Sequence, residues 1–135
     1  VKQLATGMEM PEVNQIELHV FLPQTELVQY CRDQGMQIMG YCPFARQKGA
    51  GNQALVDIGQ KHGKTESQVM LRWSLQQERI TIPKSTTESH ILQNCDVFGD
   101  WYLTDEEMNS LDNLANGFKA STSVNHQDIP WDEVK

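Results

Sequence analysis

The sequence is poor in cysteine, in positive charge and in long apolar runs, and each shortage argues against a class of function. Its three cysteines, Cys31, Cys42 and Cys95, form no C-x-x-C pair, so we expect no metal site and reduced thiols in the cytoplasm. Lys and Arg total 11 against 18 Asp and Glu, and a net charge of -7 argues against nucleic acid as a partner. No apolar run approaches the roughly 20 residues of a membrane-spanning helix, so we expect no membrane association.

The composition that is present is that of a folded domain. Hydrophobic residues make up 39% of the 135 residues and charged residues 21%, unlike the composition of disordered chains. This length suits one ordinary domain. The chain opens on Val1, within an apparent helix that has Leu4, Ala5 and Met8 on one face, which favours a part of a longer protein.

Three short apolar runs have the length of buried strands, at residues 13–18, 37–41 and 79–83. Between the first two, residues 24–33 have a helical apolar face, and Gly35 follows where a left-handed residue would end a helix. Strands and helices that alternate in this way form parallel sheets with right-handed crossovers. The pattern predicts an α/β fold and leaves open a doubly wound sheet or a TIM barrel.

Capping residues mark the helices that follow. In a capping box, a Ser or Thr at the helix start and a Glu or Gln three residues later bond each other's backbone. The expected boundaries are Gly63 at the end of one helix, capping boxes at Thr65–Gln68 and Thr104–Glu107, a helix start near Thr86, and Gly117 at the end of the last helix. Residues 120–125 are polar and predict a loose linker.

The most informative segment runs from Ile82 to Thr87, where a strand ends and a helix begins within a few residues. Carboxyl ends of strands are where α/β folds bind ligands. Lys84, the hydroxyls of Ser85 and Thr86, and the first N–H groups of the helix would together suit one phosphate. The glycines of a P-loop are missing from this segment. Taken alone, the segment would favour a surface lysine beside an ordinary helix cap.

Other motifs occur in order along the chain. They are Asn14–Gln15 in the first strand, Tyr41 to Phe44 at the end of the second, and Gln93–Asn94 on the helix after the third. With the runs KHGKTESQVMLRW and LTDEEMNSLDNL, the sequence from Pro11 to about Leu114 resembles the aldo-keto reductase superfamily. The resemblance implies the carboxyl-terminal portion of such a protein, a partial TIM (β/α)8 barrel comprising the last three parallel strands and their helices. We assign residues 1–117 to the barrel and 118–135 to a C-terminal tail.

The resemblance also implies an NADPH-dependent reductase, which converts a carbonyl to an alcohol by hydride transfer. Gln15 would hydrogen-bond the nicotinamide carboxamide, and Tyr41 would stack on the nicotinamide ring. Cys42, Pro43 and Phe44 would open the loop over the pyrophosphate, which continues through residues 47–52. Alone, Gln15 or Tyr41 would be interpreted as an interior amide or a core aromatic.

The adenosine end of NADP falls on the third strand and its helix. By the resemblance, Lys84, Ser85 and Thr86 would bind the 2′-phosphate, which favours NADPH over NADH. His90 stands where the family usually has an arginine, and because His is shorter and mostly neutral at pH 7, the preference for NADP is expected to be weaker. Gln93 and Asn94 match a pair that meets the adenine amino group, although a solvated helical face is the equally ordinary interpretation.

The catalytic set of the family, an Asp, a Tyr, a Lys and a His, lies upstream of the matching region. The chain alone is therefore expected to be inactive and to act on a small-molecule carbonyl only in a full barrel. Three of eight strands leave two open edges and an uncovered face, so a missing N-terminal half or self-association is expected.

Two other functions remain open from the sequence. One is a non-catalytic nucleotide-binding or association module on the same scaffold. The other is an unrelated small α/β domain in which residues 84–86 hold some phosphate, and this domain would bind simple phosphomonoesters as tightly as NADP. An upstream extension with the catalytic residues at strand ends would favour the enzyme.

The remaining polar and aromatic residues have structural interpretations. His19, His62 and His126 lack partners at metal-ligand spacing, and Met70 and Trp73 have the spacing of core residues. Residues 105–107 are acidic and suit the start of a helix. Trp131 could line the substrate mouth or belong to a frayed end.

Overall fold

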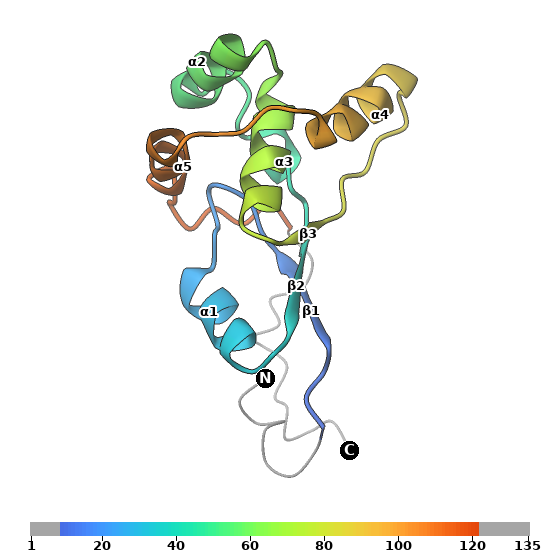
Figure 1. Cartoon of the computed structure of the whole chain (residues 1–135), viewed down its shortest axis with the longest axis vertical. Helices are drawn as coiled ribbons and strands as arrows, with labels where there is room; N and C mark the ends of the chain where they lie inside the picture. The colour runs from blue at the N-terminus through green and yellow to red at the C-terminus, as the bar shows by residue number, and fades with distance from the viewer. Residues whose placement is uncertain (1–8, 122–135) are drawn as a thin grey trace.

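Three parallel strands form one open sheet in the computed structural model, which describes residues 9–121. They are β1 (Val13–Glu17), β2 (Gln37–Tyr41) and β3 (Ile80–Thr81), in the order β1-β2-β3. Helix α1 (Thr25–Asp33) connects β1 to β2 and lies against one side of the sheet (Figure 1). The predicted α/β class and crossover connections are confirmed. Among residues 9–121, no helix is long and apolar enough to cross a bilayer.

Four further helices gather beyond the carboxyl ends of the strands (Figure 1). They are α2 (Gln53–His62), α3 (Glu66–Gln76), α4 (Glu88–Cys95) and α5 (Asp105–Asp112), with short 3-10 turns at Ala45–Gln47 and Asp96–Phe98. Most of their boundaries follow local chemistry, as predicted. Gly63, at φ 63°, ends α2 in a left-handed conformation that glycine adopts without strain. Both capping boxes form, at the starts of α3 and α5.

Helix α3 is the centre of the larger core. Val69, Leu71 and Trp73 are buried among α2, α5 and the chain that follows α4. A smaller part of the core lies between α1 and the sheet, where Val28 and Cys31 face Ile38. The two parts fix the sheet and the start of α3 relative to each other, and the pocket described below lies at that junction.

Two predicted boundaries are wrong. Strand β3 is shorter than residues 79–83, because Arg79 donates its N–H to Ser74 O in the turn after α3 and Pro83 has no N–H to give to a sheet. Helix α5 ends at Asp112 with Asn113 as its cap. Gly117 instead has φ 73° in the following segment, and its N–H bonds the carbonyl of Phe21.

The first residues of the proposed tail pack against the rest of the domain. Ala120 is buried, so the expected loose linker does not start at that residue. The division at residues 117 and 118 stays a prediction. The helix expected at residues 4–8, together with His126 and Trp131, lies outside the described residues.

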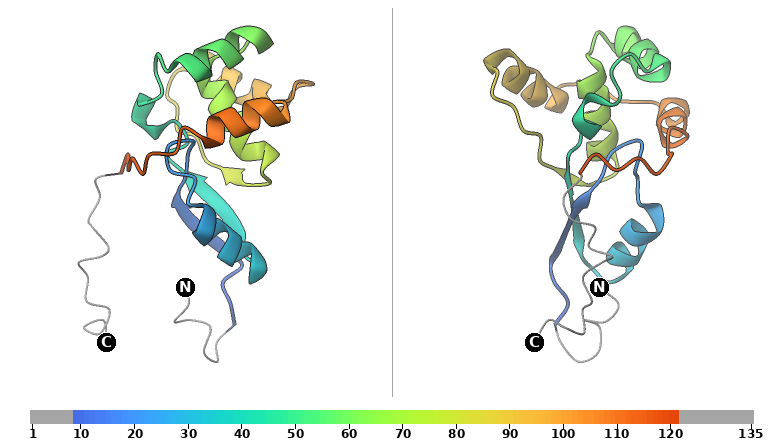
Figure 2. Two further views of the ribbon diagram at one scale, coloured as in Figure 1. Left: turned by 90° about the vertical axis from the view of Figure 1, so that its left-hand side faces the viewer. Right: turned by 180° about the vertical axis from the view of Figure 1, so that it is seen from behind.

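The face of the sheet opposite α1 is open. The register pairs Gln15 with Met39 and Met39 with Ile80, so these side chains share that face. Val13, Ile80 and Ile82 are each about two-fifths exposed there. Helix α4 also stands apart from α2 and α5 (Figure 2), and Leu92 of α4 and Phe98 of the 3-10 turn after it are largely exposed. The uncovered face expected of a partial barrel is present.

Candidate functional site

Gln15 and Tyr41 lie on the same, open face of the sheet. The side chain of Asn14 bonds the Cys31 sulfur of α1 (3.3 Å), so Gln15, its neighbour in the strand, points the opposite way. Gln15 is exposed, and its Nε2 donates a hydrogen bond to the Met39 sulfur at 3.0 Å. Tyr41 is half-buried at the end of β2, level with Glu17 of β1. Of the two predicted nicotinamide residues, Tyr41 therefore ends its strand, whereas Gln15 is the middle residue of β1.

The loop after Tyr41 turns through an unusual backbone. Four of its residues that are not glycine have positive φ angles between 46° and 64°: Cys42, Ala45, Arg46 and Gln47. Residues with a Cβ rarely adopt this conformation, and runs of it occur mainly where a fold constrains a functional loop. The loop buries Pro43 and directs Phe44 into a pocket.

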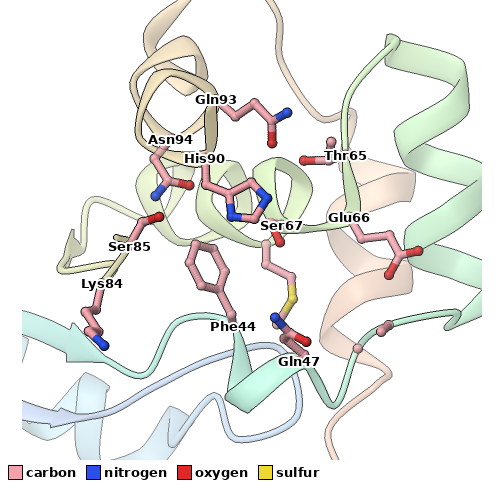
Figure 3. Close-up of a pocket in the computed structure, with 13 residues that line it drawn as sticks. Phe44, Gln47, Thr65, Glu66, Ser67, Lys84, Ser85, His90, Gln93 and Asn94 are labelled. Carbon is pink, nitrogen blue, oxygen red and sulfur yellow. The ribbon is translucent and has the colours of Figure 1, made fainter. Parts of the chain in front are cut away.

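The pocket has a volume of about 320 Å³ and lies between this loop, the start of α3 and the segment from β3 into α4 (Figure 3). Six of the predicted cofactor residues line it: Phe44, Lys84, Ser85, His90, Gln93 and Asn94. The other walls come from two groups: Gln47, Gly49 and Ala50 of the loop, and Thr65, Glu66, Ser67 and Met70 of α3. Three segments of the chain, each about 20 residues from the next in sequence, thus meet at one site.

One end of the pocket is suited to an anion. Lys84 is exposed, and the Ser85 hydroxyl accepts the Thr87 N–H at 3.3 Å in the turn before α4. Thr87 caps α4 without a side-chain hydrogen bond, which leaves the first N–H groups of that helix available to a ligand. Lysine charge, a hydroxyl and a helix start are the groups that bind phosphate.

Five predicted residues lie outside the lining of this pocket. Gln15 and Tyr41 are on the sheet, and Cys42 and Pro43 belong to the loop after β2. Thr86 is exposed in the turn before α4. The predicted set is therefore divided between the pocket and the strand ends. The roles of all eleven residues stay predictions.

The start of α3 is a wall that the sequence analysis missed. Glu66 accepts the Gly51 N–H through both carboxylate oxygens, at 3.1 and 3.4 Å, which ties the loop after β2 to α3. The capping box at Thr65 marked a helix start, but no local signal places that start opposite α4. Met70 is buried, as expected of a core residue, yet it also lines the pocket.

Two of the histidines pair with carboxylates. His19 lies 3.1 Å from Glu17, and His62 lies 2.9 Å from Glu107. Within residues 9–121, no three His, Cys, Asp or Glu side chains are placed to hold a metal ion. All three cysteines are free, and Cys31 is buried.

The chain has many relatives. The sequence model of the Aldo/keto reductase family matches residues 4–116. Uncharacterized oxidoreductase YtbE of Bacillus subtilis is 38% identical over 96% of this chain and 46% of its own length. Glyoxal reductase of the same organism is 43% identical over 77% of this chain and 37% of its own length.

Solved structures agree with the sequence match. Aldo-keto reductase AKR2E5 of the silkworm Bombyx mori, in complex with NADPH, is 35% identical and superimposes with a TM-score of 0.79 over 89% of this chain and 40% of its own. The chain thus spans less than half the length of these relatives. The three parallel strands correspond to part of their barrel, and because the family match covers most of the sequence, this chain belongs to the aldo/keto reductase family.

Proposed function

We propose that this chain is the cofactor-binding, carboxyl-terminal part of a reductase that uses NADPH to convert an aldehyde or ketone to an alcohol. The observation that carries the proposal is the pocket, where six residues predicted from separate motifs meet. The NADPH complex of the silkworm relative and the name glyoxal reductase support the cofactor and the substrate class.

The pocket would hold the adenosine end of NADPH. Lys84 would supply charge to the 2′-phosphate, and Ser85 together with the start of α4 would supply directed hydrogen bonds. Gln93 and Asn94, on the next turns of α4, would reach the adenine. His90 offers less charge than an arginine, and Glu66 adds a carboxylate on the opposite wall. We therefore expect NADPH to be preferred over NADH by a modest margin.

The nicotinamide end would lie along the open face of the sheet. The Gln15 amide bonds a weak acceptor, the Met39 sulfur, so it could exchange that contact for the nicotinamide carboxamide. The half-buried ring of Tyr41, one step nearer the strand ends, would stack on the nicotinamide. The loop from Cys42 through Phe44 would then pass over the pyrophosphate between the two ends.

The reaction needs more than this chain. When bound, NADPH supplies the hydride, and the protein must hold the ring and deliver a proton to the carbonyl oxygen. The residues proposed above bind and orient the cofactor but do not include the proton donor. Tyr102, for example, packs its ring against the Arg72 guanidinium at 4.1 Å. The chain alone is expected to bind NADPH without turnover.

Lys84→Ala is expected to weaken binding of NADPH about 10- to 100-fold, because one charge-assisted contact to a phosphate is lost. Binding can be followed by quenching of tryptophan emission during titration with NADPH. NADH has no 2′-phosphate, so its affinity should change little in the same variant.

The matched control is Lys119→Ala, which removes an equal charge from an exposed side chain that does not line the pocket. Its affinity for NADPH should equal that of the unaltered chain. An affinity of the Lys84→Ala variant for NADPH that equals that of the unaltered chain would exclude the 2′-phosphate role. Binding of a simple phosphomonoester as tightly as NADPH would favour a generic phosphate site instead.

A second candidate is a non-catalytic module that associates through its sheet. The exposed Val13, Ile80 and Ile82 favour it, since an apolar face of this kind is normally covered. Binding of NADPH without turnover by a protein that also contains the upstream strands would support this function over the reductase.

A further inference from the structure

Glu17 is buried on a face of the sheet that is otherwise open. It is the strand partner of Tyr41 and shares the face of Gln15, two residues earlier. Gln15 is exposed, whereas Glu17 is only 6% exposed. A buried carboxylate is costly unless it is hydrogen-bonded or paired. Glu17 must therefore have hydrogen-bond donors within the fold.

The partners come from the far end of the chain. The N–H groups of Ala120 and Ser121 donate to the two carboxylate oxygens of Glu17, the second at 2.9 Å. His19 Nε2 lies 3.1 Å from the carboxylate oxygen that accepts from Ala120. Burial lowers the pKa of His19, opposed by its hydrogen bond to Glu17, so a neutral ring donates from Nε2 at pH 7. Three donors converge on one carboxylate.

The same segment is attached at a second point. The N–H groups of Asn116 and Gly117 both donate to the carbonyl of Phe21, at 3.1 Å each. Between the two attachments, the Phe118 ring lies 6.3 Å from the His19 ring, and Lys48 Nζ lies 5.4 Å from the centre of the Phe118 ring. Residues 116–121 thus cross the carboxyl end of β1 and contact the loop after β2.

We infer that Glu17 is a positioning residue that anchors the C-terminal segment over the carboxyl end of β1. The Phe21 carbonyl holds the beginning of residues 116–121, and the Glu17 carboxylate holds the paired N–H groups at their end. Ser121 is therefore held at a fixed point on the side where Tyr41 lies. If the proposed function holds, this point lies beside the nicotinamide site at Tyr41, and Glu17 positions the segment there.

Glu17→Gln tests the anchor, because the new NH2 group must face a backbone donor or His19. Trypsin should cleave after Lys119 about tenfold faster or more in this variant, since cleavage follows local opening. The amide protons of Ala120 and Ser121 should move upfield in the NMR spectrum as their charge-assisted bonds are lost. Cleavage after Lys61, within α2, should keep its rate and so exclude general unfolding.

Glu12→Gln is the control, because it removes the same charge from an exposed residue just before β1. It should leave both measurements unchanged. Rapid hydrogen exchange at Ala120 and Ser121 in the unaltered chain would overturn the anchor, even if Glu17→Gln fails to fold. Unchanged cleavage after Lys119 in a folded Glu17→Gln variant would do the same.

The cofactor experiment keeps this inference separate from the proposed function. The ratio of the NADPH and NADH affinities should be the same, within about twofold, in Glu17→Gln and in the unaltered chain, because Glu17 lies outside the pocket proposed for the adenosine end. Lys84→Ala should show the reverse pattern, with weak binding and normal resistance to trypsin. A failure of Lys84→Ala to affect binding would end the proposed function and leave the anchor standing.

Discussion

Trp73→Ala is expected to lower the free energy of unfolding by about 3–5 kcal/mol, the cost of emptying a large core site. Trp73 is fully buried on α3, and its indole N–H donates to Asp112 Oδ1 of α5 at 2.7 Å. Its loss removes both the packing and the link between the two helices. Urea denaturation followed by far-UV circular dichroism at pH 7 measures the change.

A second contact of Trp73 adds to this cost. The Arg79 guanidinium stacks on the indole ring, 4.7 Å from its centre, and burial lowers the Arg79 pKa to about 10. Removing the ring leaves a buried cation without its aromatic cover. Trp73→Phe keeps most of the ring area and should lose less than half as much.

Phe98→Ala is the control for removal of an aromatic side chain. Phe98 is 74% exposed, so its loss should change the unfolding free energy by less than about 0.5 kcal/mol. A cost below about 1 kcal/mol for Trp73→Ala would contradict the central place of α3 in the core.

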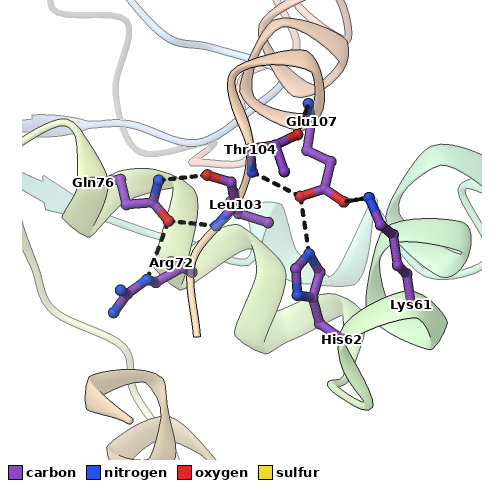
Figure 4. A network of polar contacts seen from close by, with 7 residues as sticks. All are labelled: Lys61, His62, Arg72, Gln76, Leu103, Thr104 and Glu107. Carbon is purple, nitrogen blue, oxygen red and sulfur yellow. Dashed lines mark hydrogen bonds and ion pairs between the residues drawn. The ribbon is translucent and has the colours of Figure 1, made fainter. Parts of the chain in front are cut away.

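Glu107→Gln is expected to cost about 2–3 kcal/mol at pH 7, because Glu107 joins α2 to α5 (Figure 4). Its nearly buried carboxylate accepts hydrogen bonds from Lys61 (2.7 Å), His62 (2.9 Å) and the Thr104 N–H (2.8 Å). A glutamine side chain in its place could accept only some of these bonds and would carry no charge. Urea denaturation at pH 7 and at pH 3 checks the prediction.

The pH dependence of this effect follows from the Glu107 pKa. Burial raises that pKa, but the hydrogen bonds from Lys61, Thr104 and His62 outweigh it and hold the value at about 2, below the ordinary 4.5. The stabilisation is therefore complete above pH 4.5 and is lost as the pH falls toward 2. The difference in stability between the unaltered chain and Glu107→Gln should shrink between pH 7 and pH 3.

Asp105→Asn is the matched control, since Asp105 is exposed in the same first turn of α5. Any effect of a negative charge on the helix dipole is common to both variants and is worth about 0.3–1 kcal/mol. If Asp105→Asn and Glu107→Gln cost the same at pH 7, the contacts of Glu107 with α2 contribute nothing.

The sequence predicted the features that depend on neighbouring residues. The capping boxes at Thr65 and Thr104 form as expected, and Gly35 and Gly63 both adopt positive φ angles after their helices. Each of these depends on atoms within about four residues of one another. The expected end of α5 at Gly117 was wrong because that glycine serves a distant contact, with Phe21, rather than the helix.

The site was predicted only in part. Family motifs identified Lys84, His90 and Asn94, and these do meet in one pocket. The wall at Glu66 was missed, because the approach of α3 to α4 depends on how both helices pack on the core. The same packing left Thr86 outside the pocket, although it is adjacent in sequence to Ser85.

By itself, the sequence determined the α/β alternation, most of the helix boundaries and the family, because hydrophobic periodicity, caps and motifs each depend on a short stretch of residues. Only the tertiary structure decided which surfaces meet: the pocket between α3 and α4, and the contact of Glu17 with residues 120 and 121, more than 100 positions away. Such contacts depend on the closure of long loops by the core, and nothing in the residues beside Glu17 specifies where its hydrogen-bond donors come from.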